Sequence, residues 1–353
     1  MKGKRPGKLP TLSFCSTRRM GIEIEVNSTD GLGRPEGRRE EPAGIDMLMH
    51  EVAKNVEEGC VKSGYMHTEK NPTWVVKPDS SCGLEVVSPP LKGSLGVTKV
   101  VKLVDSFRMN EQIKADRRCS LHAHVEVADL TRQQIAAVVA WWLKCEAVIM
   151  DAMPSIRKRN KYCQFLGLLP LFQVENNYTA DEIIDRVGKV KYFSINAFMM
   201  VQGGFERMTL EFRVGENEMC KQPFLVKNWL RFILHFVEMA AQAGMPKPYD
   251  PGDRWSGLCW LEPEDVFSLL GFWNEPQKYE LSNGLCQVRD WFLARLLTYQ
   301  AKHNEPGLPR TIAHRQVQEL AGKFAAAGIE VNPELMLHPA NLETALYDES
   351  LKF

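Results

Sequence analysis

Two glutamates separated by one residue stand in a stretch whose other side chains are apolar, Met20-Gly21-Ile22-Glu23-Ile24-Glu25-Val26. Side chains alternate between the two faces of a strand, so Glu23 and Glu25 lie on one face and the branched apolar side chains on the other. Neighbouring carboxylates repel each other, and burial disfavours their charged forms unless a cation compensates them. The pair indicates either a divalent-cation site or, as an isolated motif, the solvated acidic face of a half-exposed strand.

A second predicted strand carries one carboxylate among apolar side chains. Leu84-Glu85-Val86-Val87 is typical of a short strand that ends at a Pro-Pro pair, and the preceding Asp79-Ser80-Ser81 has turn-forming residues. Glu85 is therefore another acid on a strand built mainly from apolar residues. Taken alone, it is weak evidence for a site.

A third stretch, Cys119-Ser120-Leu121-His122-Ala123-His124-Val125-Glu126-Val127, alternates polar and apolar residues. Period two places His122, His124 and Glu126 on one face. Two imidazoles on one strand face could bind a cation or donate to a phosphate, and they could equally be a pair of hydrogen-bonded, half-buried histidines.

The fourth stretch, Thr209-Leu210-Glu211-Phe212-Arg213-Val214, places Glu211 and Arg213 on one face of a predicted strand. On a surface they would form an ion pair that contributes little. Beside a metal-bound triphosphate, the glutamate would ligate the ion and the arginine would stabilise a phosphoryl group during transfer.

A basic run, Arg157-Lys158-Arg159-Asn160-Lys161, follows the third stretch on a predicted loop. Such a run is commonly a solvated patch. Next to a site of carboxylates and histidines it could instead hold the phosphates of a nucleotide, and Arg157 and Arg159 are candidates for that contact.

The elements that must position these residues follow from apolar periodicity. Helices are predicted over 45–58, 95–114, 131–153 and 179–188, and the third and fourth of these begin with capping boxes at Thr131 and Thr179. Further helices are predicted over 224–243, 263–273, 285–303, 311–327 and 340–350. Residues 27–43 are expected to form an exposed loop. The sequence thus predicts a disordered basic arm over 1–17, a catalytic α+β domain over 18–222 and a helical lobe over 223–353.

Composition excludes several classes of protein. Lys+Arg and Asp+Glu both number 44 in 353 residues, so no net charge favours nucleic acid or an anionic membrane. The nine cysteines contain no C-x-x-C spacing, which argues against a zinc ribbon or a disulfide framework. No apolar run has the roughly 20 residues of a membrane span, and the N-terminus lacks a signal-like apolar core. These features predict a cytoplasmic protein with no membrane contact.

The four polar strand faces become informative together. Neighbouring antiparallel strands of one curved sheet would bring their acids, histidines and arginine to a single concave face. A site of carboxylate oxygens with an imidazole and few thiols suits Mg²⁺ or Mn²⁺ better than zinc. Such ions, bound to a nucleoside triphosphate, support phosphoryl transfer.

Five motifs in this order resemble the amidoligase family of the carboxylate-amine ligase superfamily, which also holds glutamine synthetase and γ-glutamylcysteine ligase. The resemblance covers roughly residues 18–220 and rests on these motifs: Gly21-x-Glu23-x-Glu25, Asp79-x-Ser81 with Glu85-Val86-Val87-Ser88-Pro89-Pro90, Leu121-His122-x-His124-Val125, Arg157 to Cys163, and Thr209-x-Glu211-Phe212-Arg213. It implies a glutamine synthetase-like catalytic sheet and a two-step reaction. ATP phosphorylates a carboxylate, and an amine then displaces phosphate to give an amide.

The resemblance also implies roles for individual residues. Six residues would be metal ligands, on the substrate side Glu25, Glu85 and Asp79, and at the nucleotide phosphates Glu23, His122 and Glu211. The catalytic set would be Glu25, Glu211 and Arg213, of which Arg213 stabilises the phosphoryl group in transfer. Further nucleotide contacts would come from His124, Arg157, Arg159 and Arg213.

Two other classes of function stay open at this point. The chain could be a non-catalytic nucleotide- or metabolite-binding protein on the same scaffold. It could also be an interaction or nucleic-acid-binding protein, which its balanced charge disfavours. For a ligase, the partners are a carboxylate substrate, either an amino acid, a peptide or a protein, and an amine. The sequence names neither substrate, nor the oligomeric state.

Overall fold

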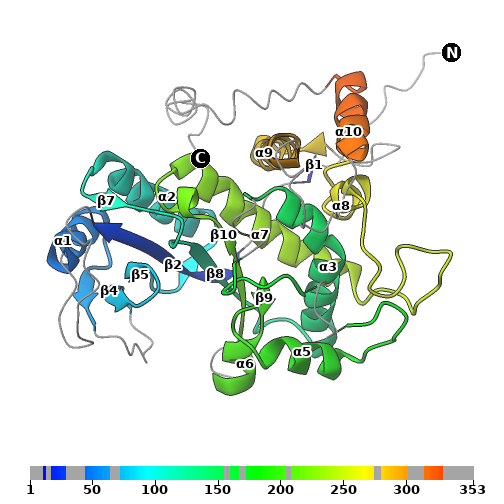
Figure 1. Cartoon of the computed structure of the whole chain (residues 1–353), viewed down its shortest axis with the longest axis horizontal. Coiled ribbons are helices and arrows are strands. Elements are labelled where there is room, and N and C mark those ends of the chain that lie inside the picture. The colour runs from blue at the N-terminus through cyan, green and yellow to red at the C-terminus, as the bar shows by residue number, and fades with distance from the viewer. Residues whose placement is uncertain are drawn as a thin grey trace, which may run out of the picture.

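The computed structural model describes residues 11–12, 17–28, 44–63, 72–154, 157, 160–166, 172–203, 208–273, 280–300 and 314–328 of the 353. Within these ranges the centre of the fold is a sheet whose strands follow the order β3-β4-β5-β2-β8-β10-β9, with β6 and β7 also paired to β2 (Figure 1). The strands are β2 (Arg19–Ser28), β3 (Cys60–Lys62), β4 (Trp74–Asp79), β5 (Gly83–Val87), β6 (Leu91–Lys92), β7 (Ile113–Lys114), β8 (Leu121–Glu126), β9 (Ile195–Asn196) and β10 (Thr209–Gly215).

The described strands of this sheet pair antiparallel except for β3 with β4. The long strand β2 lies at its middle, with β5 on one side and β8 on the other. The predicted α+β class and the mainly antiparallel sheet are therefore confirmed.

The apolar face of the sheet is covered by helices. Ile22, Ile24 and Val26 of β2 are at most 1% exposed. The ring of Trp142 lies 5.0 Å from that of Phe212 on β10 and 5.3 Å from that of Phe236. These rings come from α3 (Arg132–Asp151) and α7 (Pro223–Ala243), so both helices pack behind the strands that carry the polar residues.

The remaining described helices are α1 (Ile45–Asn55), α2 (Gly93–Met109), α5 (Ala180–Gly188), α6 (Phe198–Gly203), α8 (Pro263–Leu269), α9 (Asn283–Gln300) and α10 (His314–Ala326). All but α6 match predicted helices, with shifts of a few residues at the ends, whereas α6 forms where no helix was predicted. The helix predicted over 95–114 ends at Met109, and its last two residues form β7 instead. The predicted capping boxes at Thr131 and Thr179 are confirmed, since each side chain accepts from the third residue of its helix and that residue bonds back.

Two buried charged side chains attach the region after residue 222 to the rest. The ammonium of Lys144 on α3 donates to the carbonyl oxygens of Arg254, Ser256 and Gly257 at 2.9, 2.9 and 3.2 Å. Arg295 on α9 pairs with Glu216, which directly follows β10. These contacts join the regions that the sequence divides at residue 222, and the proposed domain boundary itself stays a prediction.

Several predicted segments fall partly or wholly outside the described residues: the loop over 27–43, Lys158 and Arg159, and the helix over 340–350. The first two residues of that loop, Asn27 and Ser28, form the end of β2 instead. Within the segment expected to be a disordered arm, Thr11–Leu12 forms β1, which pairs in parallel with β11 (Glu280–Leu281). No helix in the described ranges has both the length and the apolar character needed to cross a bilayer.

Candidate active site

The register of the sheet brings the predicted polar residues to one face. Glu25 of β2 lies opposite Glu85 of β5, and Glu23 lies opposite His122 of β8. His124 lies opposite Glu211 of β10. Residues that stand opposite each other point to the same side of a sheet, so the acids and imidazoles from four strands share one surface.

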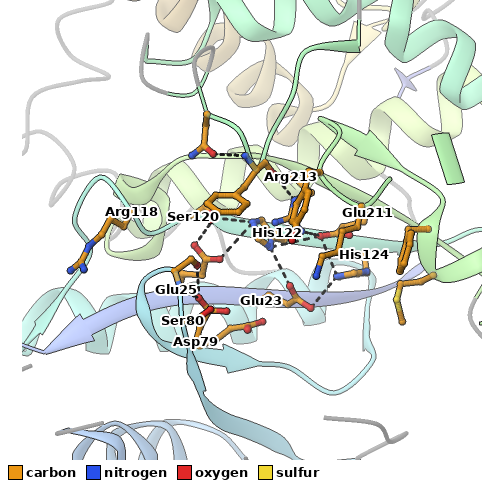
Figure 2. A pocket seen from close by; sticks show the side chains of 18 of the residues that line it. Glu23, Glu25, Asp79, Ser80, Arg118, Ser120, His122, His124, Glu211 and Arg213 are labelled. Atoms are coloured by element: carbon orange, nitrogen blue, oxygen red, sulfur yellow. Dashed lines mark hydrogen bonds and ion pairs between the residues drawn. The ribbon is translucent and has the colours of Figure 1, made fainter. Parts of the chain in front are cut away.

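This surface forms the floor of a pocket of about 400 Å³. Figure 2 shows the labelled acids and histidines pointing into the space between β2, β8 and the β4–β5 turn. The lining residues are mostly charged or polar, and they are Glu23, Glu25, Lys77, Asp79, Ser80, Ser81, Glu85, Arg118, Ser120, His122, His124, Arg157, Asn160, Tyr162, Lys191, Tyr192, Phe198, Met199, Glu211 and Arg213. All predicted site residues that the structure describes therefore line one pocket, and Arg159 lies outside the described ranges.

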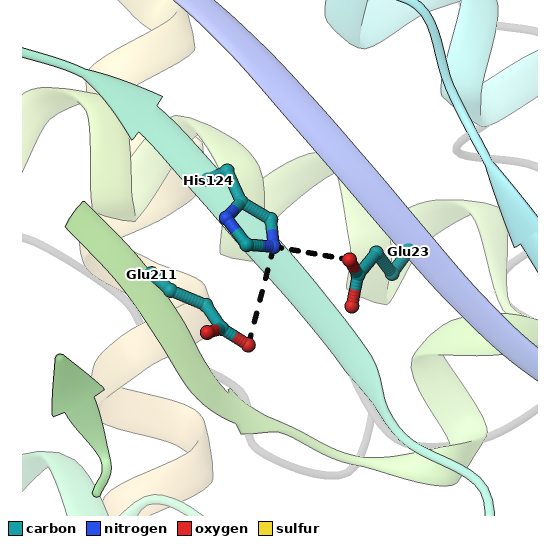
Figure 3. A group of neighbouring side chains, drawn as sticks. All are labelled: Glu23, His124 and Glu211. Atoms are coloured by element: carbon teal, nitrogen blue, oxygen red, sulfur yellow. Dashed lines mark ion pairs between the residues drawn. The ribbon is translucent and has the colours of Figure 1, made fainter. Parts of the chain in front are cut away.

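Within the pocket, Glu23, His124 and Glu211 form one compact group, called here the Glu23 group (Figure 3). One potential ligand atom from each lies within 4.8 Å of the others. The Nε2 atom of His124 is 3.2 Å from Oε1 of Glu23 and 4.0 Å from Oε1 of Glu211. Three adjacent strands thus supply the three side chains.

Electrostatics in the Glu23 group favour charged carboxylates. Burial alone would raise the pKa of Glu23, but the charge of His124 and hydrogen bonds from His122 and His124 lower it well below its ordinary value. Burial also acts on Glu211, yet the charges of His124 and Arg213 lower its pKa. Burial opposes protonation of His124, but Glu23 and Glu211 raise its pKa to about 9. In the absence of a metal, His124 is the cation of this group.

Arg213 is fixed at the edge of the Glu23 group. Its Nη1 atom donates to Oε1 of Glu211, and its Nε atom donates to the carbonyl oxygen of Tyr162 at 2.8 Å. Asn196 donates to the other oxygen of Glu211 at 3.0 Å. The Arg213 side chain is 12% exposed and lines the pocket, so its position is defined while part of it stays available to a ligand.

A second compact group, called the Glu25 group, consists of Glu25, Asp79 and Cys82. The Oδ1 atom of Asp79 accepts hydrogen bonds from the backbone N–H of Ser81 at 2.7 Å and from that of Cys82 at 3.2 Å, as expected for the predicted turn. Burial raises the pKa of Glu25, and the charge of His122 and the hydroxyl of Ser120 only partly oppose this rise. Glu25 therefore lacks full charge compensation, which is the condition that favours a bound cation.

Ser120 and His122 connect the two groups. The hydroxyl of Ser120 donates to Oε2 of Glu25 at 2.6 Å and lies 2.8 Å from Nε2 of His122. The Nδ1 atom of His122 lies 3.1 Å from Oε2 of Glu23 and 3.8 Å from Oε1 of Glu211. His122, which is 3% exposed, therefore touches acids of both groups and is a member of neither.

Lys77 also lies on this face, although it was not among the predicted site residues. It stands on β4 opposite Glu85, and its Nζ atom is 2.9 Å from Oε2 of Glu85. Burial and the charge of Glu23 raise the pKa of Glu85 well above its ordinary value, and Lys77 opposes this rise. Lys77 and Asp79 are two residues apart on β4, so strand alternation places Lys77 on the same face as Asp79.

Other lining residues have no motif that would reveal them. Lys191 and Tyr192 precede β9, whereas Phe198 and Met199 begin α6. Arg157, from the predicted basic run, is buried at 3% exposure, and its guanidinium donates to the carbonyl oxygen of Arg213. Arg157 therefore supports the strand that carries Arg213 in addition to bordering the pocket.

The residues present fit magnesium or manganese. The Glu23 group offers carboxylate oxygens and one imidazole, which is a donor set for a hard or borderline divalent ion. The Glu25 group offers two carboxylates with one thiol. Oε1 of Glu85 is buried without a hydrogen-bond partner among the described residues, so the pocket also has an acceptor left for a ligand.

Comparisons with known proteins find solved structures that resemble this chain at low sequence identity. No curated protein sequence matches this chain. A solved structure titled "Crystal structure of novel glutamine synthase homolog" is 13% identical with a TM-score of 0.42, and the match covers 88% of this chain and 71% of that one. A bifunctional glutathione synthetase from Pasteurella multocida is 10% identical with a TM-score of 0.37, and the match covers 94% of this chain and 52% of that one. This chain thus spans about half of the second protein.

The family comparison covers the region that holds the site. The model described as "Putative amidoligase enzyme" matches residues 16–213, which is more than half of the chain and includes all of β2 and the residues up to Arg213. The resemblance to the amidoligase family that the sequence motifs indicated is therefore confirmed, and the chain belongs to that family.

Proposed function

We propose that this chain is an ATP- and Mg²⁺-dependent ligase that joins a carboxylate to an amine through an acyl phosphate, on a curved sheet of the glutamine synthetase type. One observation carries the proposal: two separate sets of ligand atoms, the Glu23 group and the Glu25 group, line a single pocket with Arg213 at its edge. A reaction that joins two substrates while a triphosphate is cleaved requires that the negative charges of both the nucleotide phosphates and the substrate carboxylate be neutralised.

The Glu23 group is assigned to the nucleotide side and the Glu25 group to the acid side. Mg²⁺ or Mn²⁺ bound by these groups would neutralise the phosphates and the reacting carboxylate. His124 joins Glu23 and Glu211 as a ligand, and His122 is placed to orient Glu23 through the 3.1 Å contact. Glu25, Glu211 and Arg213 remain the proposed catalytic residues.

Arg213 stabilises the negative charge that develops on the phosphoryl group during its transfer. A carboxylate is a poor electrophile, so its oxygen must first attack the γ-phosphorus, with ADP as the leaving group. The amine then attacks the acyl carbon, phosphate leaves with the electron pair of the C–O bond, and the amine loses a proton. The Glu211 and Tyr162 contacts hold the guanidinium in one position, so little reorganisation is needed during transfer.

Tyr192, Phe198 and Met199 add aromatic and thioether side chains to the lining of the pocket, which suits a nucleobase. Lys191 and Arg157 also line the pocket and would bind the phosphates of the nucleotide. The acid, whether an amino acid, a peptide or a protein, would then enter from the side of Asp79, Ser80 and Ser81. The catalytic region over 18–222, the helical lobe over 223–353 and the cytoplasmic location are parts of the same proposal.

The test uses the purified full chain with ATP, Mg²⁺ and pools of amino acids and short peptides, and hydroxylamine as the amine. An acyl phosphate would be trapped as a hydroxamate, and ADP would form in equal amount. Glu23→Gln should abolish both products without loss of the fold. ADP and hydroxamate absent with every acid pool, or unaffected by Glu23→Gln, would contradict the proposal and favour a non-catalytic binding role.

A further inference from the structure

The two ligand groups leave out one of the acids on the same face. Glu85 is only 4% exposed and stands directly opposite Glu25, yet it belongs neither to the Glu23 group nor to the Glu25 group. Its nearest cation is supplied by the chain itself, because the Nζ atom of Lys77 is 2.9 Å from Oε2 of Glu85. Lys77 is 17% exposed, so this ion pair is largely removed from water.

We propose that Lys77 is a positioning residue that occupies Glu85 in place of a metal ion and so limits the acid side of the pocket to one divalent cation, held by Glu25 and Asp79. This inference rests on the proposed metal-dependent function and adds a specific count to it. It assigns Glu85 a partner other than the metal that the family motif implies.

Charge balance supports the assignment. The Lys77–Glu85 pair is neutral, and the remaining acids of this end, Glu25 and Asp79, carry together the charge that one divalent ion neutralises. A second divalent ion at Glu85 would lie beside a fixed ammonium in a poorly solvated place, where like charges repel strongly. The ion pair is also built into the sheet, because Lys77 and Glu85 are register partners on β4 and β5.

The ion pair leaves Glu85 one free acceptor. Oε1 has no hydrogen-bond partner among the described residues, whereas Oε2 faces Lys77. With the metal held elsewhere, this oxygen is available to an N–H or O–H donor of the bound acid or amine. Lys77 therefore fixes the orientation of the Glu85 side chain, with Oε2 toward the ammonium and Oε1 open as an acceptor.

The experiment counts bound Mn²⁺ by electron paramagnetic resonance titration of the metal-free full chain, without nucleotide or substrate. The variants are Lys77→Met, Lys77→Arg, Glu85→Gln and the double variant Lys77→Met with Glu85→Gln. We expect Glu85→Gln and Lys77→Arg to bind the same number of ions as the wild type. Lys77→Met should bind one more per chain, because Glu85 then needs a cation, and the double variant should lose that additional ion.

Each alternative outcome is decisive. If Glu85→Gln binds one ion fewer than the wild type, or if Lys77→Met binds no more, the inference is overturned while the proposed function stands. If the wild type binds no Mn²⁺ at all, the inference falls together with the proposed function. Thermal unfolding and circular dichroism of each variant show whether the fold is retained, and Lys77→Arg keeps the cation should Lys77→Met fail to fold.

Discussion

The polar face of the sheet and the helical layer behind it both bury charged side chains, but they satisfy them differently. In the helical layer, Lys144 is 0% exposed and meets three carbonyl oxygens. Glu146 is also 0% exposed and accepts from the hydroxyl of Ser194 and from the backbone N–H of Leu166. The chain itself provides strong partners for both charges.

On the polar face, by contrast, acids share their partners. Glu23 and Glu211 both approach the same nitrogen of His124, and Glu25 and His122 both contact the hydroxyl of Ser120. Buried charge is costly when it is only partly satisfied, so such an arrangement is maintained where a ligand completes it. We therefore distinguish charges that stabilise the fold from charges that a ligand would complete, and four measurements test this distinction.

The largest effect is expected at Arg213. Arg213→Met should reduce the rate of ADP formation by about 10³-fold, because cations at this position in phosphoryl-transfer sites contribute on that scale. Arg213→Lys keeps the charge without the fork of donors and should recover only part of the loss. A rate within threefold of the wild type in Arg213→Met would remove this residue from the reaction.

Lys144 should show the opposite behaviour. Lys144→Met leaves three buried carbonyl oxygens without their donor, so the free energy of unfolding should fall by about 3 kcal/mol. The rate of ADP formation per folded molecule should not change. Urea unfolding followed by tryptophan fluorescence measures the first quantity, and a loss below about 1 kcal/mol would mean that this ammonium does not hold the fold.

Two serines offer a matched pair. Ser120 and Ser194 are both buried, and each bonds to one glutamate and to one ring nitrogen. Ser120→Ala should weaken Mn²⁺ binding by about 10- to 100-fold with little change in stability. Ser194→Ala should lower the free energy of unfolding by about 1–3 kcal/mol and leave Mn²⁺ affinity unchanged. Equal effects of the two substitutions on both quantities would erase the distinction between the two regions.

The smallest effect concerns Lys227 on α7. Burial, together with the charge of Arg231, lowers the pKa of Lys227 to about 8 from its ordinary 10.5. The unfolded chain then keeps this proton to a higher pH than the folded chain, so the contribution of Lys227 to stability increases as the pH rises from about 8 to about 10.5. The wild type should gain stability relative to Lys227→Met across this window. A constant difference between them would show that the ammonium is well solvated.

Much of the site was predictable because strand alternation is a local property. The faces that carry Glu23 and Glu25, His122 and His124, and Glu211 and Arg213 follow from period two alone, and the apolar backs predicted a covered sheet. The helix caps at Thr131 and Thr179 were equally local. These features depend on a few consecutive residues and on no distant contact.

Features that depend on register or ring orientation could not be predicted. Nothing in the sequence states that Lys77 lies opposite Glu85, since that requires the pairing of β4 with β5. His122 and His124 are equivalent by spacing, yet only His124 joins the Glu23 group, because the ring of His122 lies between Ser120 and Glu23. The roles assigned to the site residues stay predictions until the variants are measured.

The central place of β2 has a kinetic consequence. Its site residues meet partners that are far along the chain: Ser120 is 95 residues from Glu25, and His122 is 99 residues from Glu23. Closing such long loops costs entropy before any contact compensates it, so contacts of this kind form slowly and together. The Glu23 group should therefore emerge in one late folding step, and a nascent chain should not acquire it before β8 and β10 have been synthesised and paired.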